Sequence, residues 1–164
     1  MRGGYSMDNQ ALFLRRAEGQ DENILLEWTN DKSARLNSFN SEEISPESHR
    51  KWLHKALTSD DIEMFIMMNG NIPVGQIRLE IAGGCGTISY SISERYRGFG
   101  YGKKILQLLE SWIANNYDIE FLIIGLVKKS NEISGHIFES GNYNKSENDE
   151  YIKYIKQIVP KQDK

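Results

Sequence analysis

A segment that could bind an anion lies in the middle of the chain. In "RGFGYGKK" (97–104) three glycines stand at alternate positions, directly before a run with helical periodicity. Exposed glycines destabilise a helix start unless a ligand uses them. The free N–H groups of a first helical turn point at one spot, and the helix dipole adds positive potential there. With Arg97, Lys103 and Lys104 beside it, this segment predicts a phosphate or pyrophosphate site.

The glycine spacing excludes the two commonest phosphate loops. A P-loop ends in Gly-Lys-Ser/Thr, whereas Gly102 is followed by two lysines and no hydroxyl that would ligate magnesium. A dinucleotide-binding loop reads G-x-G-x-x-G, whereas Gly98, Gly100 and Gly102 are spaced G-x-G-x-G. We expect no metal site. The lone cysteine, Cys85, has no acid–base partner beside it in the sequence and is expected to be a small structural thiol.

The elements that position this segment follow from hydrophobic periodicity. They predict a mixed α/β domain in the order β-α-α-β-β-β-α-β-α-β. Strands are expected at 11–17, in a hairpin over 62–81 that turns at Asn69–Gly70, and at 87–93, 121–127 and 150–158. Helices are expected at 24–28, 46–57 (with Ser45 as cap and Pro46 at its first position), after the glycines, and at 131–140. The polar stretch 32–43 is expected to hold one or two helical turns at most. The apolar run at 121–127 is typical of a strand covered on both faces.

Length, charge and composition narrow the function classes. A chain of 164 residues fits one domain, expected at 11–158 between a flexible arm (1–10) and a tail (159–164). A net charge of −3 without a long basic block argues against a nucleic-acid partner. No apolar run reaches the ~18 residues of a membrane span, and a single cysteine suits a reducing cytoplasm. We therefore expect a cytoplasmic protein, a monomer or homodimer, that acts on small molecules and not on a membrane.

The glycine segment, placed between the fourth strand and the third long helix, resembles the R-x-x-G-x-G/A loop of the GCN5-related N-acetyltransferases (GNAT). The resemblance extends over 11–158. It implies a GNAT fold, with a mixed and mostly antiparallel sheet that splays between strands 4 and 5 and about four flanking helices. It also implies acetyl-CoA as the acetyl donor, with the pyrophosphate on the amides of 97–103.

The same resemblance assigns the other donor contacts. They are expected on the fourth strand, the loop and the last helix, at Ser91, Ile92, Arg97, Gly98, Phe99, Gly100, Tyr101, Gly102, Lys103, Asn131, Ser134 and Phe138. The last three are spaced i, i+3 and i+7, which places them on one helix face. Many family members carry at position 138 a tyrosine that protonates the departing thiolate. Phe138 cannot do so, which leaves water, another residue such as Tyr143, or no distinct acid.

The N-terminal half resembles one subgroup of the family. "EWTNDKSARLNSFNSEEISPESHRKW" (27–52) and "VGQIRLE" (74–80) are similar to acetyltransferases of nucleotide-linked amino sugars in pseudaminic acid and spore-coat polysaccharide pathways. This implies an acceptor site built from Asn30, Arg35, Ser38, Asn40 and Arg78. Short polar side chains suit a sugar, and the two arginines suit a diphosphate. Each of the five could instead be an ordinary loop or surface residue.

Two residues are candidates for the base that deprotonates the amine. His49 has a suitable intrinsic pKa of ~6.5 but falls on the buried stripe of its helix. Glu80 lies on a central strand, and its carboxylate could equally be solvated. Three functions remain open: acetylation of a nucleotide-linked amino sugar, N-terminal acetylation of a protein by an enzyme of the ribosomal-modifier type, and acyl-CoA binding without catalysis.

Overall fold

A seven-stranded sheet forms the centre of the computed structural model, which describes residues 12–162. Its strand order is β1-β2-β3-β4-β5-β7-β6. The strands are β1 (Leu12–Arg16), β2 (Ile62–Asn69), β3 (Ile72–Ala82), β4 (Cys85–Ile92), β5 (Phe121–Lys128), β6 (Asn144–Glu147) and β7 (Tyr151–Ile158). The helices are α1 (Glu22–Thr29), α2 (Lys32–Asn37), α3 (Pro46–Thr58), α4 (Tyr101–Asn116) and α5 (Glu132–Ser140). The arm expected at 1–10 lies outside the described residues.

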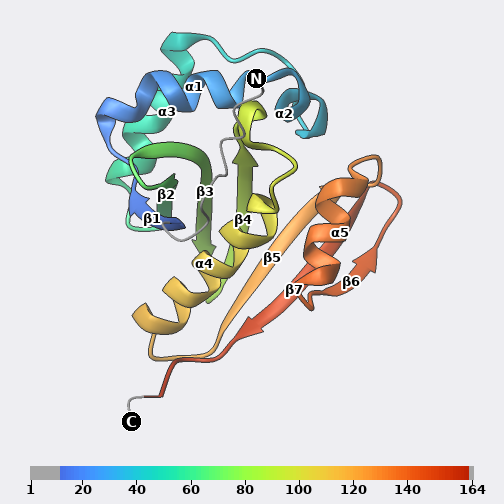
Figure 1. The fold of residues 1–164 in the computed structure, drawn as a ribbon. Helices are drawn as coiled ribbons and strands as arrows, with labels where there is room; N and C mark the ends of the chain where they lie inside the picture. The colour runs from blue at the N-terminus through green and yellow to red at the C-terminus, as the bar shows by residue number, and fades with distance from the viewer. Residues whose placement is uncertain (1–11, 163–164) are drawn as a thin grey trace, which may run out of the picture.

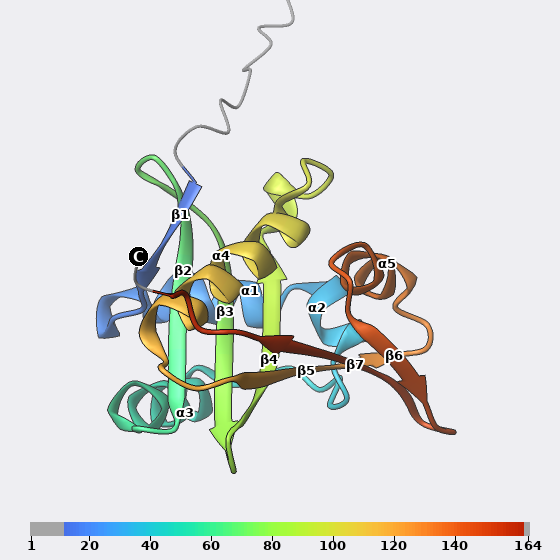
Figure 2. The same cartoon turned by 90° about the horizontal axis from the view of Figure 1, so that it is seen from below.

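Helices cover both faces of the sheet, as Figures 1 and 2 show. Alternate residues of β2 point to opposite sides: Phe65 and Met67 join the core under α4 and α5, whereas Met64 and Ile66 join a second core with α1 and α3. The pattern confirms the expected mixed α/β architecture. No helix among residues 12–162 has the length and apolar character needed to cross a membrane.

The sheet opens between β4 and β5. These strands run parallel, but their pairing begins at Cys85↔Leu122 and ends at Ile88↔Gly125. β4 continues to Ile92 while β5 turns away from it toward α5 (Figure 1). Residues 89–92 of β4 therefore have a strand on one side, β3, and an opening on the other. This is the predicted splay.

Capping side chains fix where the N-terminal helices begin. Ser45 accepts a hydrogen bond from the N–H of Ser48 and Pro46 starts α3, as expected. In the same way Asp31 accepts from the N–H of Ala34 and starts α2. The buried Asp21, in the turn before α1, receives two 2.8 Å hydrogen bonds from the Arg15 guanidinium. The caps thus fix where α2 and α3 begin, while α1 and α3 pack on one face of the sheet.

Three sequence-based expectations were wrong. β6 was missed, because its residues (144–147) are all exposed and polar and give no hydrophobic pattern. β5 is not covered on both faces: Phe121, Ile123 and Val127 are buried, but Leu122 and Leu126 are 40% and 38% exposed. The stretch 85–86, expected to be part of a turn, belongs to β4, and the β3–β4 turn is only Gly83–Gly84. The helices number five among the described residues, with the short α2 in the polar stretch at 32–43.

Candidate active site

The glycine segment forms an open cradle at the start of α4. Gly98 and Gly100 adopt left-handed backbone angles (φ +85° and +80°), and a Cβ at either would meet no atom within 4 Å. Gly100 caps the helix without a side chain, so the N–H groups of the first turn have no side-chain acceptor at the cap. The amides face open space, as an anion site requires, and the residues present therefore fit a pyrophosphate.

Gly102 has a different role from its two neighbours. A Cβ there would lie 2.6 Å from Cδ1 of Ile137 on α5 and 3.7 Å from the ring of Tyr90 on β4. The missing side chain lets the start of α4 approach the second half of α5 beside the opening of the sheet. This close approach brings the loop, β4 and α5 together.

The first turn of α5 completes the donor side of the opening. Asn131 caps the helix by accepting from the N–H of Ser134. The Ser134 hydroxyl lies 3.0 Å from the Tyr90 hydroxyl and joins α5 to β4. Phe138 is buried, with its ring stacked on Tyr154. Asn131 and Ser134 thus lie beside the opening, and their donor contacts stay predictions, whereas Phe138 belongs to the core.

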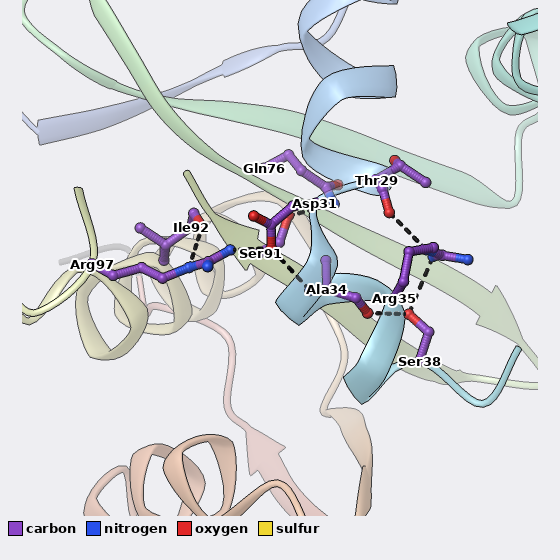
Figure 3. Close-up of polar contacts among 9 residues, drawn as sticks. All are labelled: Thr29, Asp31, Ala34, Arg35, Ser38, Gln76, Ser91, Ile92 and Arg97. Atoms are coloured by element: carbon purple, nitrogen blue, oxygen red, sulfur yellow. Dashed lines mark hydrogen bonds and ion pairs between the residues drawn. The ribbon is translucent and has the colours of Figure 1, made fainter. Parts of the chain in front are cut away.

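An ion pair joins the donor loop to the N-terminal half of the chain (Figure 3). Arg97, which precedes the glycines, donates from Nη2 to Asp31 Oδ2 at 2.7 Å and from Nε to the Ile92 carbonyl at 3.0 Å. Burial alone would raise the pKa of Asp31, but the hydrogen bonds from Arg97 and from the N–H of Ala34 outweigh it, so this pKa lies below its ordinary value. The bridge is therefore intact at neutral pH and is lost only when the pH falls through that lowered pKa.

A cleft, called the large cleft from here on, lies beside this bridge. Its volume is about 620 Å³, and it separates α1 and α2 from the end of β4. It is lined by Glu27, Trp28, Asp31, Lys32, Ser33, Leu36, Ile92, Ser93, Glu94, Arg95 and Arg97. A second, smaller cleft of about 260 Å³ lies along the donor loop, with Phe99, Gly100, Tyr101 and Lys103 in its wall. The large cleft has the size that small ligands occupy, and the second cleft is smaller than that.

The polar residues predicted to hold the acceptor shape the α2 segment itself. Arg35 donates to the carbonyls of Thr29, Asn40 and Glu42 and to the Ser38 hydroxyl. Figure 3 shows its contacts with Thr29 and Ser38. The Asn30 side chain forms two hydrogen bonds with the backbone of Ile44. Asn40 accepts from the N–H of Glu42 and Ser38 donates to Ala34. None of these four side chains lines the large cleft.

The remaining candidates form a cluster between α3 and β3. Arg78 lies over the Trp52 ring, 4.8 Å from its centroid, and pairs with Glu80 at 3.0 Å. His49 is 2% exposed, its ring lies 6.0 Å from that of Trp52, and burial lowers its pKa. Neither His49 nor Glu80 lines the large cleft. Their predicted roles as bases remain predictions.

A sequence model of the GNAT domain, described as an acetyltransferase domain, matches residues 11–142 of the chain. The chain belongs to the GNAT family. It is an acetyltransferase with acetyl-CoA as its donor. The open amide cradle and the splayed strands β4 and β5 fit that donor. No curated protein sequence matches the chain significantly.

Solved structures share the fold of this GNAT enzyme at low sequence identity. A spermidine N-acetyltransferase from Vibrio cholerae, with CoA and spermine, superposes with a TM-score of 0.82 at 14% identity, over 92% of this chain and 97% of the other. A Salmonella typhimurium acetyltransferase that modifies the N-terminal serine of ribosomal protein L7/L12 gives 0.76 at 18%, over 90% and 95%. The aminoglycoside acetyltransferase AAC(6')-Ib with coenzyme A gives 0.75 at 16%, over 88% and 94%.

Sequence reasoning missed several residues of the site. Glu27 and Asp31 are four residues apart, at the end of α1 and just beyond it, a spacing that directs both to one side. That signal was available, but Asp31 was noted only as part of a motif. Lys32, Glu94 and Arg95 belong to polar turns, where the sequence does not distinguish a cleft residue from a solvated one. Tyr90 lies in the strand expected at 87–93, where no motif marks it.

We predict that Gly100→Ala weakens CoA binding at least about tenfold, because the new methyl group stands at the mouth of the cradle and the backbone is left-handed there. Gly84→Ala is the matched control, since Gly84 has nearly the same angle (φ +78°) and the same open surroundings in the β3–β4 turn. Both variants should lose roughly 1–2 kcal/mol of stability. Calorimetric titration with CoA separates them; equal affinities for the two variants would refute the assignment of the cradle.

We predict that Asp31→Asn raises the KM for the acceptor several-fold, since a partly exposed ion pair contributes up to about 1 kcal/mol. Asparagine still caps α2, so the variant removes only the charge that holds Arg97. Asp21→Asn is the control: it breaks the pair with Arg15, away from the clefts, and should lower the melting temperature without changing either KM. Steady-state kinetics would contradict the bridge's role if Asp31→Asn kept the KM of the parent.

Proposed function

We propose that the enzyme acetylates the primary amine of a nucleotide-linked amino sugar, by direct attack of the amine on the thioester while both substrates are bound. The observation that supports this most is a pair of cations in the wall of the large cleft. Lys32 and Arg95 line it and are exposed, and neither forms an ion pair within residues 12–162. Unpaired cations in a cleft suit a diphosphate. The similarity of residues 27–52 and 74–80 to enzymes of this class supports the same acceptor.

In this proposal Arg35 and Arg78 do not bind the diphosphate. The donors of Arg35 are used by its own loop, and Arg78 is held between Trp52 and Glu80. We propose that Arg35 instead gives the α2 segment its shape, with Asn30, Ser38 and Asn40. Lys32 and Arg95 then bind the diphosphate.

The chemistry needs positioning more than covalent participation of the protein. Residues 89–92 of β4 carry backbone groups on the side that β5 leaves open, and these can hold the donor arm and polarise the thioester carbonyl. Two carboxylates, Glu27 and Glu94, line the same cleft as the cations. We propose that one of them, ahead of His49 and Glu80, takes the proton of the amine.

A cationic amine is a second candidate acceptor, favoured by those same two carboxylates. Two of the structural neighbours are a spermidine acetyltransferase and an aminoglycoside acetyltransferase. The cleft of this chain, however, holds Lys32 and Arg95 against Glu27 and Glu94, so it does not have the acidic excess that a polycation would favour. An N-terminal amine of a protein stays the third possibility.

Release of CoA, measured against a panel of nucleotide-linked amino sugars, free amino sugars, polyamines and N-terminal peptides, tests the proposal. We predict that a nucleotide-linked sugar has the highest kcat/KM. Lys32→Ala and Arg95→Ala should each raise its KM about tenfold, the effect of ~1.4 kcal/mol, and leave the KM for the corresponding free sugar unchanged. Lys55→Ala, on the exposed side of α3, is the control. Equal losses with both sugars would show that these cations do not bind the diphosphate.

A further inference from the structure

Loss of the hydroxyl at position 138 leaves the departing thiolate without its usual proton donor, and packing explains the phenylalanine there. A Cβ built on Gly125 of β5 would lie 2.4 Å from Cζ of Phe138. The end of this ring therefore faces the backbone of β5, where a tyrosine hydroxyl would have no room. Phe138 is 2% exposed and stacked on Tyr154, so the ring cannot turn toward the opening of the sheet without unpacking the core.

Tyr143 does not replace the missing hydroxyl. Its ring lies under the ammonium group of Lys156, which binds Glu110 of α4. Burial first, and the charge of Glu110 second, raise the pKa of Tyr143 far above its ordinary value. Tyr143 is 6% exposed and belongs to the core between α4 and β7.

Tyr90 is a phenol in the right place. It lies two residues beyond Ile88, where the pairing of β4 with β5 ends, and directly before Ser91. Its ring approaches three parts of the donor site: the glycine loop at Gly102, where its edge would be 3.7 Å from a Cβ, the hydroxyl of Ser134 at 3.0 Å, and the ring of Phe138. Tyr90 thus lies between the first turn of α4, directly after the pyrophosphate cradle, and the first turn of α5.

The geometry points to Tyr90 as the catalytic residue that donates a proton to the sulfur of the departing CoA. The step rests on the acetyl transfer but not on the identity of the acceptor. As the amine displaces CoA, the C–S bond breaks with its electron pair on sulfur, and the phenolic proton moves to that sulfur. The Tyr90 phenolate then regains a proton from solvent through the hydroxyl of the half-buried Ser134. Burial raises the pKa of Tyr90 and the Ser134 hydrogen bond offsets this in part, so the phenol carries its proton at neutral pH.

The first test uses CoA alone, without any acceptor. If the Tyr90 hydroxyl donates to the sulfur, it stabilises the thiolate of bound CoA. Tyr90→Phe should then raise the pKa of the bound CoA thiol, measured by the ultraviolet absorbance of the thiolate as the difference between loaded and unloaded protein. Tyr143→Phe is the matched control: it removes one phenolic hydroxyl that also lies beside Phe138, and should leave the thiol pKa unchanged.

The second test uses turnover with any amine that the enzyme accepts. Tyr90→Phe should lower kcat about 10²-fold or more, as loss of a general acid does, while the KM for acetyl-CoA stays within about threefold of the parent. Ser134→Ala keeps the Tyr90 hydroxyl but removes its hydrogen bond to residue 134. This variant should also raise the pKa of the bound CoA thiol, by less than Tyr90→Phe does. An unchanged thiol pKa in both variants, or a Tyr90→Phe enzyme that loses CoA affinity and not kcat, would overturn the proposal. Failure of the nucleotide-sugar acceptor would leave the first test unaffected.

Discussion

The ion pair between Asp31 and Arg97 is the contact on which the arrangement of the site depends. It joins residues 66 positions apart: one belongs to the segment over the large cleft and the other to the donor loop. The same carboxylate starts α2 by capping it, and the same guanidinium holds the end of β4 through the Ile92 carbonyl. The pair therefore links the donor loop, the cleft wall and the last residues of β4.

Its energetic contribution is small compared with its geometric one. The two side chains are 36% and 14% exposed, and such pairs add little to the free energy of unfolding because water screens them. Stability comes instead from the two apolar cores on either side of the sheet. The pair ties the start of α2 to the donor loop, and such positioning is what a reaction between two bound substrates needs.

The strands, most helices and the donor loop could be predicted from the sequence because each follows from a local rule. Ser45 and Pro46 mark the start of α3, and the alternate glycines mark the start of α4. β6 could not be predicted, because an edge strand with four exposed polar residues is stabilised only by its pairing with β7. The run at 121–127 was misjudged because hydrophobic residues do not reveal whether a second layer covers them: Leu122 and Leu126 face no helix.

The acceptor site was the hardest part to predict for a related reason. Arg35 has the residue type of a phosphate ligand, but backbone carbonyls brought together by the loop use its donors. Only the three-dimensional arrangement shows that Lys32 and Arg95 line the large cleft and form no ion pair within residues 12–162. Tyr90 was invisible for the same reason, since its relation to Ser134 spans 44 positions of the chain.

We propose that Asp31 and Arg97 act as one unit that joins the donor side of the site to the acceptor side. A double-mutant cycle tests it directly: kcat/KM is measured for the parent, Asp31→Ala, Arg97→Ala and the double variant. We predict that kcat/KM of the double variant is hardly lower than that of either single variant. This corresponds to a coupling free energy of about 1 kcal/mol or more. Two losses that simply add would contradict it.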